Sequence, residues 1–212
     1  MSTVIAGVPI PETAAARAAT HFAREHTSPL IFDHSRRVYL FGSLRADALG
    51  WKPDRELLYV ASMMHDTGLF TPFSENEQRF ELDGADHARR LLLEHGFEPA
   101  DAEIVWTAIA LHTTPGIPGR MRPEVAVTNL GVLVDVLGLS LDDLDNDRVA
   151  EITAAHPRGD FKNGFLQAFV DGLAHRPDTT YGTVNADVLE RFVPEFRRGS
   201  MVDRIICSAW AT

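Results

Sequence analysis

The segment from Pro123 to Leu139 is apolar on every side of the helix that its composition predicts. A helix without a polar face is buried on all sides, so we expect it at the centre of a helical bundle. Asp135 nevertheless lies in this segment, between Gly131 and Gly138, where small residues allow another helix or a ligand to approach closely. An ionised carboxylate in apolar surroundings needs a cation or a full set of hydrogen-bond donors.

Two more polar residues, His65 and Asp66, directly follow the apolar run at residues 57–64. A divalent metal ion is the natural partner for both, because imidazole nitrogens and carboxylate oxygens are common metal ligands. His34 lies upstream in a similarly apolar segment. The sequence therefore predicts that His34, His65, Asp66 and Asp135 bind one ion at the centre of the bundle.

The rest of the chain also carries helical signals. Ser28 and Pro29 are typical of a helix start, Asp83 is a candidate N-cap, and Gly50 and Gly96 are typical of helix ends. Alternating apolar runs, which would indicate strands, are weak. We predict a single all-α domain over residues 1–212. Its expected helices cover residues 12–25, 29–50, 53–66, 83–95, 99–112, 123–139, 147–155, 161–175 and 186–196, with a loop at 69–82 and no assignment after 199.

Charge and composition narrow the range of partners. The net charge of −10 disfavours DNA, RNA and anionic membrane surfaces, all of which attract clusters of Lys and Arg. The chain has one cysteine, Cys207, a poor match to a signal peptide at its start, and no run near the roughly 20 apolar residues needed to span a bilayer. We expect a cytoplasmic protein with a small-molecule substrate, and a homodimer is plausible.

Two further histidines are candidates for chemistry. His87 lies in the predicted helix at 83–95, and His112 closes the helix before a loop rich in glycine and proline. Each could simply cap a helix or face solvent. An imidazole that titrates near neutrality is also suited to proton transfer beside a metal ion. We therefore keep His87, His112 and the neighbouring Thr113 as candidate catalytic residues.

Four motifs give the chain a family resemblance. They are FDHSRRVY at residues 32–39, MHDTG at 64–68, FELDGA at 80–85 and AIALHT at 108–113. Together they resemble the HD-domain superfamily of metal-dependent hydrolases, and within it the cyanamide hydratase branch, over about residues 28–140. The resemblance implies a helical bundle whose metal ligands are His34, His65, Asp66 and Asp135. It also implies zinc or iron, with zinc typical of the hydratase branch, and a single ion with His87 and His112 lining the pocket. A second metal bound by these two histidines is the alternative.

The resemblance further implies a metal-activated water that attacks an electrophilic carbon, as in the conversion of cyanamide to urea. His87, His112 or Thr113 would then supply a proton. Three other functions stay open: a nucleotide phosphohydrolase, a di-iron oxygenase and a non-catalytic ligand-binding module. The phosphohydrolase is disfavoured because Leu69, and not lysine, follows Gly68, and because the chain contains only the lysines Lys52 and Lys162.

Overall fold

The computed structural model describes residues 3–74 and 77–210, and this part of the chain is helical almost throughout, as predicted. The α-helices are α1 (Ala14–His26), α2 (Pro29–Leu49), α3 (Arg55–Met64), α4 (Phe80–Glu94), α5 (Pro99–Leu111), α6 (Pro123–Leu137), α7 (Asn146–Ala155), α8 (Phe161–Leu173), α9 (Asn185–Phe192) and α10 (Met201–Ile206). Short 3-10 helices lie at η1 (Thr67–Leu69), η2 (Pro118–Arg120), η3 (Leu141–Asp143) and η4 (Pro177–Thr180). The strands β1 (Val4–Ile5) and β2 (Val8–Pro9) form a small antiparallel hairpin that the sequence did not indicate.

Most helix boundaries follow the capping signals. In α2, the Ser28 side chain accepts a hydrogen bond from the backbone N–H of Ile31, and Gly50 ends the helix with a left-handed backbone, φ 69°. The start of α4 differs from the prediction, because the helix begins at Phe80 and Asp83 does not cap it. The Asp83 carboxylate instead forms a buried ion pair with Arg176 and accepts a hydrogen bond from the backbone N–H of Phe73. A contact between distant segments therefore replaces the local cap.

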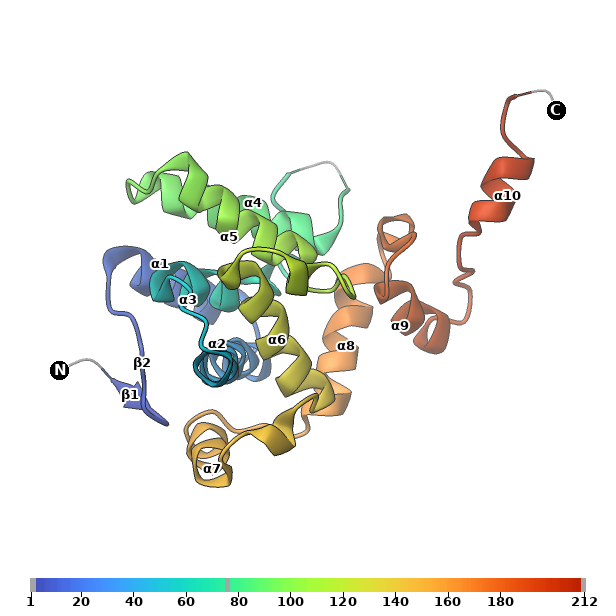
Figure 1. Cartoon of the computed structure of the whole chain (residues 1–212). Coiled ribbons are helices and arrows are strands. Elements are labelled where there is room, and N and C mark those ends of the chain that lie inside the picture. Colours follow the sequence, from blue (N-terminus) through green and yellow to red (C-terminus); the bar gives the residue numbers. More distant parts are fainter. Residues whose placement is uncertain (1–2, 75–76, 211–212) are drawn as a thin grey trace.

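Helices α2 and α6 cross at the centre of the bundle (Figure 1). The crossing is close because glycines face the partner backbone. A Cβ atom on Gly131 would lie 2.2 Å from the carbonyl oxygen of Val38, and one on Gly42 would lie 2.9 Å from that of Val127. Both approaches are shorter than a carbon atom tolerates, so glycine is required at each position. This confirms the expectation for Gly131, whereas Gly138 ends the helix with a left-handed backbone and a Cβ atom there would meet nothing within 4 Å.

The burial of α6 is less complete than the sequence predicts. Val125, Ala126 and Val127 are buried, but Val132, Leu133 and Val136 are only partly covered and Leu137 is exposed. The uncovered face of the helix lines a cavity, described below. Apolar composition alone could not distinguish a face that packs against another helix from a face that lines a cavity.

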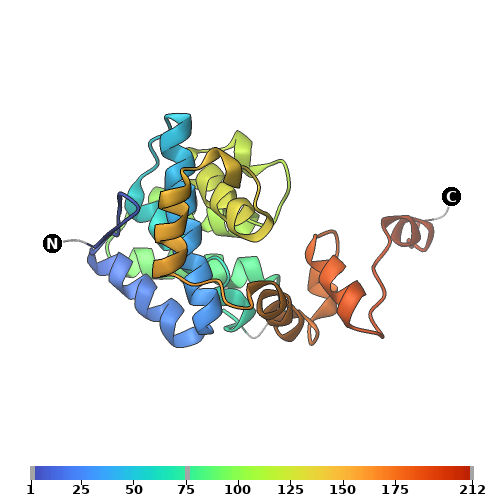
Figure 2. The ribbon, with the colours of Figure 1, turned by 90° about the horizontal axis from the view of Figure 1, so that it is seen from below.

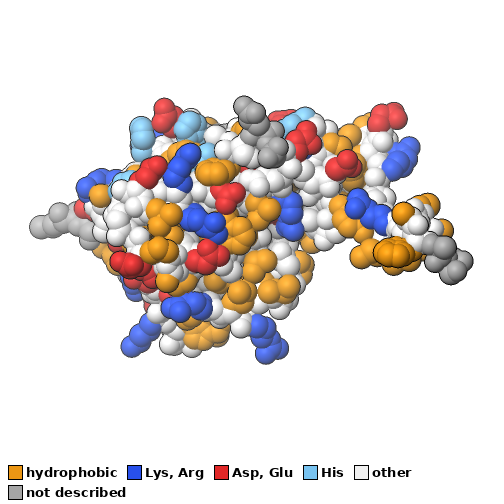
Figure 3. Space-filling model, turned by 90° about the horizontal axis from the view of Figure 1, so that it is seen from above, with side chains coloured by type: hydrophobic (Ala, Val, Ile, Leu, Met, Phe, Trp, Pro, Cys, Tyr) orange, Lys and Arg blue, Asp and Glu red, His pale blue; other side chains and the backbone are white. Residues whose placement is uncertain are grey.

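The C-terminal segment extends away from the bundle (Figures 1 and 2). Helix α10 contains no buried residue, and its apolar side chains Met201, Val202, Ile205 and Ile206 are exposed. Figure 3 shows hydrophobic side chains gathered on this arm. Among the helices that the structure describes, none is both long and apolar enough to cross a bilayer.

Replacing Gly131 with alanine is expected to lower the free energy of unfolding by about 3 kcal/mol or more, because the added methyl group would meet the Val38 carbonyl and force the two helices apart. Urea unfolding followed by circular dichroism measures the change. Gly119→Ala is the control, since a Cβ atom there meets no other atom within 4 Å. Equal stability of both variants with the wild type would contradict the close crossing.

Candidate metal centre

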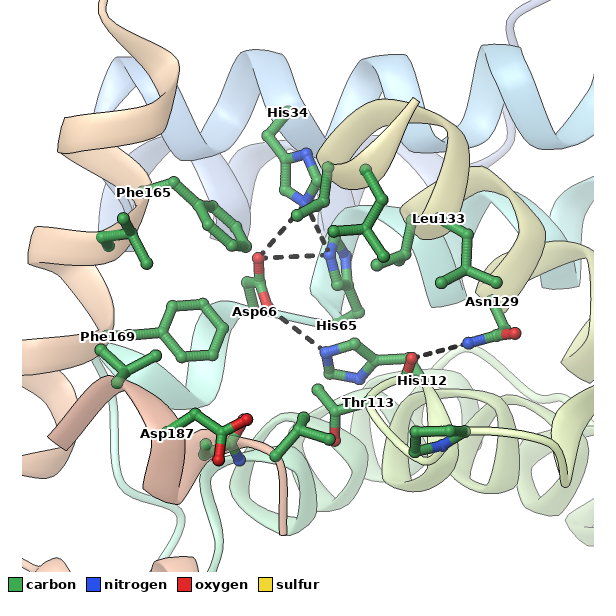
Figure 4. Close-up of a pocket in the computed structure, with 18 of the residues that line it drawn as sticks. His34, His65, Asp66, His112, Thr113, Asn129, Leu133, Phe165, Phe169 and Asp187 are labelled. Carbon is green, nitrogen blue, oxygen red and sulfur yellow. Dashed lines mark hydrogen bonds and ion pairs between the residues drawn. The ribbon is translucent and has the colours of Figure 1, made fainter. Parts of the chain in front are cut away.

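Three buried side chains from separate segments converge beside the α2–α6 crossing (Figure 4). His34 comes from α2, while His65 and Asp66 follow the last turn of α3. The Nε2 atoms of His34 and His65 lie 3.2 Å apart, and they lie 3.5 Å and 3.2 Å, respectively, from Oδ2 of Asp66. These three residues offer donor atoms that all lie within 4.8 Å of one another, so they can hold a metal ion.

His112 approaches the same carboxylate from the end of α5. Its Nε2 atom lies 3.4 Å from Oδ1 of Asp66, and its ring lies edge-on to that of His65. Figure 4 shows the three imidazole rings arranged around Asp66. The backbone carbonyl of His112 accepts a hydrogen bond from the side chain of Asn129 on α6, 2.8 Å away, which fixes the end of α5.

The hydrogen bonds of the three imidazoles determine which nitrogen carries the proton. Nδ1 of His65 lies 2.8 Å from the carbonyl oxygen of Ser62, and Nδ1 of His112 lies 2.6 Å from that of Ile109. A carbonyl oxygen only accepts, so both Nδ1 atoms donate. Nδ1 of His34 points at the carboxylate of Asp135 in the same way. In their neutral forms all three rings therefore direct the lone pair of Nε2 toward Asp66.

The three converging donors have the chemistry of a cation site. Neither buried oxygen of Asp66 has a hydrogen-bond partner in the described part of the chain, although imidazole nitrogens stand close by. The ligands of a tetrahedral zinc ion lie about 3.4 Å from one another, given bonds of about 2.0–2.2 Å. The measured separations match that spacing, and lone pairs facing a carboxylate repel one another unless a positive charge lies between them. The residues present therefore fit a divalent metal ion.

The charges of the cluster support the same conclusion. Burial alone would raise the pKa of Asp66, but His65 and His112, when they carry a proton on Nε2, lower it well below its usual value, so the carboxylate is ionised at neutral pH. Burial lowers the pKa of His34 and favours its neutral form. For His65 burial acts in the same direction, yet the adjacent Asp66 carboxylate outweighs it and raises the pKa. A proton and a metal ion therefore compete for Nε2 of His65.

Asp135 does not join this cluster, contrary to the sequence-based expectation that it is a ligand. Its Oδ2 atom lies 2.6 Å from Nδ1 of His34, on the side of the ring that faces away from Asp66. Arg37 donates to both carboxylate oxygens, at 2.8 and 3.0 Å, and Arg158 donates to Oδ1. Burial raises the pKa of Asp135, but His34 and Arg37 outweigh burial and lower it to about 2. In this arrangement Asp135 orients the His34 ring, and its assignment as a metal ligand stays a prediction.

His87 is also remote from the cluster, contrary to the expectation that it lines the active pocket. It lines a separate cavity with Phe22, Met64 and Arg90. The guanidinium of Arg90 donates to Nδ1 of His87 at 3.1 Å, and the ring packs against Phe73. Burial and the nearby Arg90 lower its pKa. A second metal site shared by His87 and His112 is therefore not assembled among the described residues.

Thr113 lies at the cavity, but its hydroxyl hydrogen is already engaged. It is donated to Glu81, a fully buried carboxylate on α4 that also accepts hydrogen bonds from Arg79 and Asn185 at 2.9 Å each. Burial raises the pKa of Glu81, but Arg79 and the other donors lower it further, so the group is ionised. Thr113 can therefore accept a hydrogen bond from a ligand but not donate one.

Sequence reasoning did not assign roles to Arg37, Glu81, Asn129, Arg158 or Asn185. Arg37 and Glu81 lie inside the quoted motifs, at residues 32–39 and 80–85. A charged residue among apolar neighbours could have indicated that each is buried and paired. The other three come from segments that the motifs do not cover, and only the fold brings them to the site.

Replacing Glu81 with glutamine is expected to lower the free energy of unfolding by about 1–3 kcal/mol, because an amide NH₂ group would face donors that now find acceptors. Urea unfolding checks this. Glu94→Gln, at an exposed position of the same helix, should differ little from the wild type. If both variants are equally stable, Glu81 does not organise this network.

A cavity of about 640 Å³ reaches the cluster from the surface. Its inner end is formed by His34, His65, Asp66 and His112, with Thr113 beside them. The remaining wall is mainly apolar and is formed by residues from α6, α8 and α9. The cluster is therefore open to a ligand from solvent.

Comparisons with known proteins agree with this geometry. The family model described as "HD domain" matches residues 31–137, about half of the chain. Two Saccharomyces cerevisiae proteins named cyanamide hydratase DDI2 and cyanamide hydratase DDI3 are each 26% identical to the chain over 155 residues, which cover 71% of this chain and 69% of each relative. The segment matched by the family model, residues 31–137, contains His34, His65, Asp66, His112 and Asp135. The chain therefore belongs to the HD domain family, whose members bind divalent metals.

Proposed function

We propose that this protein is a metal-dependent hydratase that adds water to a nitrile-type carbon, as in the hydration of cyanamide to urea. The observation that carries the proposal is the arrangement of His34, His65 and Asp66, whose unshared electron pairs meet at one buried point that opens into a cavity. The names of the similar yeast proteins support the choice of reaction.

His34, His65 and Asp66 would hold the ion, and Asp135 would keep the His34 ring in place through Nδ1. Two nitrogens and one carboxylate match the donor set that zinc takes in hydrolytic sites. When bound there, a divalent ion supplies an acidified water and polarises the group under attack.

His112 is the residue placed to move the proton. Its Nδ1 donates to a backbone carbonyl, so Nε2 is the atom that faces Asp66 and the cavity. We infer that Nε2 accepts the proton released by the attacking water and returns it to the nitrile nitrogen. Thr113 Oγ1, which only accepts, orients an amino group of the substrate.

A nucleotide phosphohydrolase is disfavoured by the lining of the cavity. Among the described residues that line it, none is a lysine or an arginine. Phosphoryl groups are normally bound by such cations, in addition to a metal. Arg37 and Arg158 are near, but both are engaged with Asp135. A neutral substrate fits the cavity better.

The test is urea release from cyanamide by protein loaded with zinc, with metal content measured on the same sample. His112→Ala is expected to lower turnover by about 10²–10⁴-fold, because proton transfer is lost, while most of the metal is retained. His87→Ala is the matched control and should keep both metal and turnover, since His87 lies in a separate cavity. Three results would refute the hydratase proposal. Phosphate release from nucleotides would indicate a phosphohydrolase, oxygen consumption with two bound irons a di-iron oxygenase, and tight ligand binding without turnover a non-catalytic module. Complete metal loss in His112→Ala would make His112 a ligand.

A further inference from the structure

The size and the apolar lining of the cavity beside the cluster are not explained by cyanamide alone. Cyanamide is one nitrile group joined to one amino group, and it would occupy only the innermost part of a space of about 640 Å³. Cavities of roughly 300–1,000 Å³ are typical of sites that enclose much larger organic ligands. The outer part of the cavity therefore needs an occupant of its own.

The walls of this outer part are apolar on three sides. Helix α6 contributes the neighbouring residues Val132 and Leu133 and, one turn later, Val136, and all three are partly uncovered. Opposite them, α8 contributes Phe165 and Phe169, which pack on one another with ring centroids 4.8 Å apart. The third wall comes from α9, with Val188. Figure 4 shows the two phenylalanines and Leu133 around the same space as the histidine cluster.

The rim of the cavity is apolar as well. Leu137 is 65% exposed, Leu139 52% and Val184 42%, and all three line the opening. Contiguous apolar surface that leads into a polar cluster is typical of a binding site, because exposing it to water is unfavourable. The polar lining residues are the histidine cluster with Asp66, Thr113, Asn129 and Asn185, together with Asp187, an exposed carboxylate on α9 that pairs with Arg198. The channel thus has a polar inner end at the histidine cluster and mainly apolar walls in its outer part.

From this separation we propose that the natural substrate is a nitrile-type compound with an apolar substituent, in which the C≡N group lies at His34, His65 and Asp66 and the substituent lies between α6, α8 and α9. The inference rests on the proposed hydratase function and specifies its substrate class. For a monosubstituted cyanamide, R–NH–C≡N, water adds across the triple bond. Both O–H bonds of water and both C–N π bonds of the nitrile break, a C=O double bond and two N–H bonds form, and the product is R–NH–CO–NH₂. No oxidant or reductant is required.

A homologous series tests the inference on the full chain loaded with zinc. The substrates are cyanamide and the n-alkylcyanamides from methyl to hexyl, and the alkylurea products are quantified by mass spectrometry. Each methylene that enters the channel should raise kcat/KM about threefold to fourfold until the channel is filled. Calorimetric titration with the corresponding alkylureas measures binding without turnover, and affinity should rise with the same dependence on chain length.

Two matched variants locate the effect. Leu137 is the last residue of α6 and Leu49 the last residue of α2; both are exposed, and each precedes a left-handed glycine, with φ 70° at Gly138 and 69° at Gly50. Only Leu137 lines the channel. Leu137→Gln should lower the ratio of kcat/KM for hexylcyanamide to that for cyanamide by about threefold or more. Leu49→Gln should leave this ratio unchanged.

The outcomes separate this inference from the function on which it rests. If cyanamide is hydrated but kcat/KM and alkylurea affinity do not rise with chain length, the apolar channel is not a substrate site and the inference is overturned, while the hydratase function stands. If no nitrile is hydrated but affinity rises per methylene, the reaction is refuted and the apolar channel is supported. A second copy of the chain could instead fill the channel with its α10. The double variant Ile205→Gln/Ile206→Gln would then dissociate the dimer. Dissociation together with no dependence of kcat/KM on alkyl length overturns the inference.

Discussion

Replacing Asp135 with asparagine is expected to lower the free energy of unfolding by about 3–5 kcal/mol, because Arg37 would keep a buried charge without its counter-charge. The same change should weaken metal binding by about 10–100-fold, since His34 would lose the carboxylate that holds its ring. Urea unfolding of the metal-free protein gives the first quantity, and competition with a chromogenic chelator gives the second.

Asp143→Asn is the matched control, because this carboxylate also pairs with an arginine, Arg45, but is exposed. Its loss should change the free energy of unfolding by less than about 1 kcal/mol. If Asp135→Asn abolished metal binding while the stability stayed at the wild-type value, Asp135 would be a direct ligand, as the sequence predicts.

Replacing His65 with alanine is expected to abolish metal binding and, with it, turnover, because Nε2 of His65 is 3.2 Å from both of the other donor atoms and its loss leaves two of the three converging ligands. A second readout does not depend on turnover. Zinc at about a thousand times its dissociation constant should stabilise the wild type by about 4 kcal/mol, seen as a higher Tm, and should leave the variant unchanged.

His95→Ala serves as the control for His65→Ala. His95 ends α4 at the surface, where its Nδ1 donates to the carbonyl of Leu91. Metal content and the zinc-dependent rise in Tm should equal those of the wild type. Full metal content in His65→Ala would refute the site.

The centre of the site was predictable from local sequence. His65 and Asp66 end an apolar helix, and His34 lies inside another, so each signals a buried polar group without any knowledge of the fold. The distinction between a ligand and a residue that orients a ligand was not predictable. It depends on Arg37 and Arg158, which saturate the Asp135 carboxylate, and Arg158 comes from the segment between α7 and α8.

The helices were predictable for a similar reason, and their errors also come from distant contacts. Caps such as Ser28 and Gly50 act within one turn, so the sequence shows them directly. Asp83 is a residue type that often caps helices, but it pairs with Arg176. The family resemblance placed His87 in the pocket, but its ring faces Arg90 and Phe73. The open face of α6 was missed because periodicity reports which residues are apolar and not what covers them.

The crossing of α2 and α6 has a consequence for engineering. Val38 lies one turn after His34, and Gly131 lies one turn before Asp135, so the backbone contact between Val38 and Gly131 stands next to the hydrogen bond between His34 and Asp135. The backbone position of His34 is therefore set by two closely packed main chains, while the Asp135 carboxylate orients its ring. Substitutions that strengthen the periphery, for example in α7 or the N-terminal hairpin, should raise resistance to heat without retuning the affinity for the ion, so thermostability and metal loading can be optimised as independent variables.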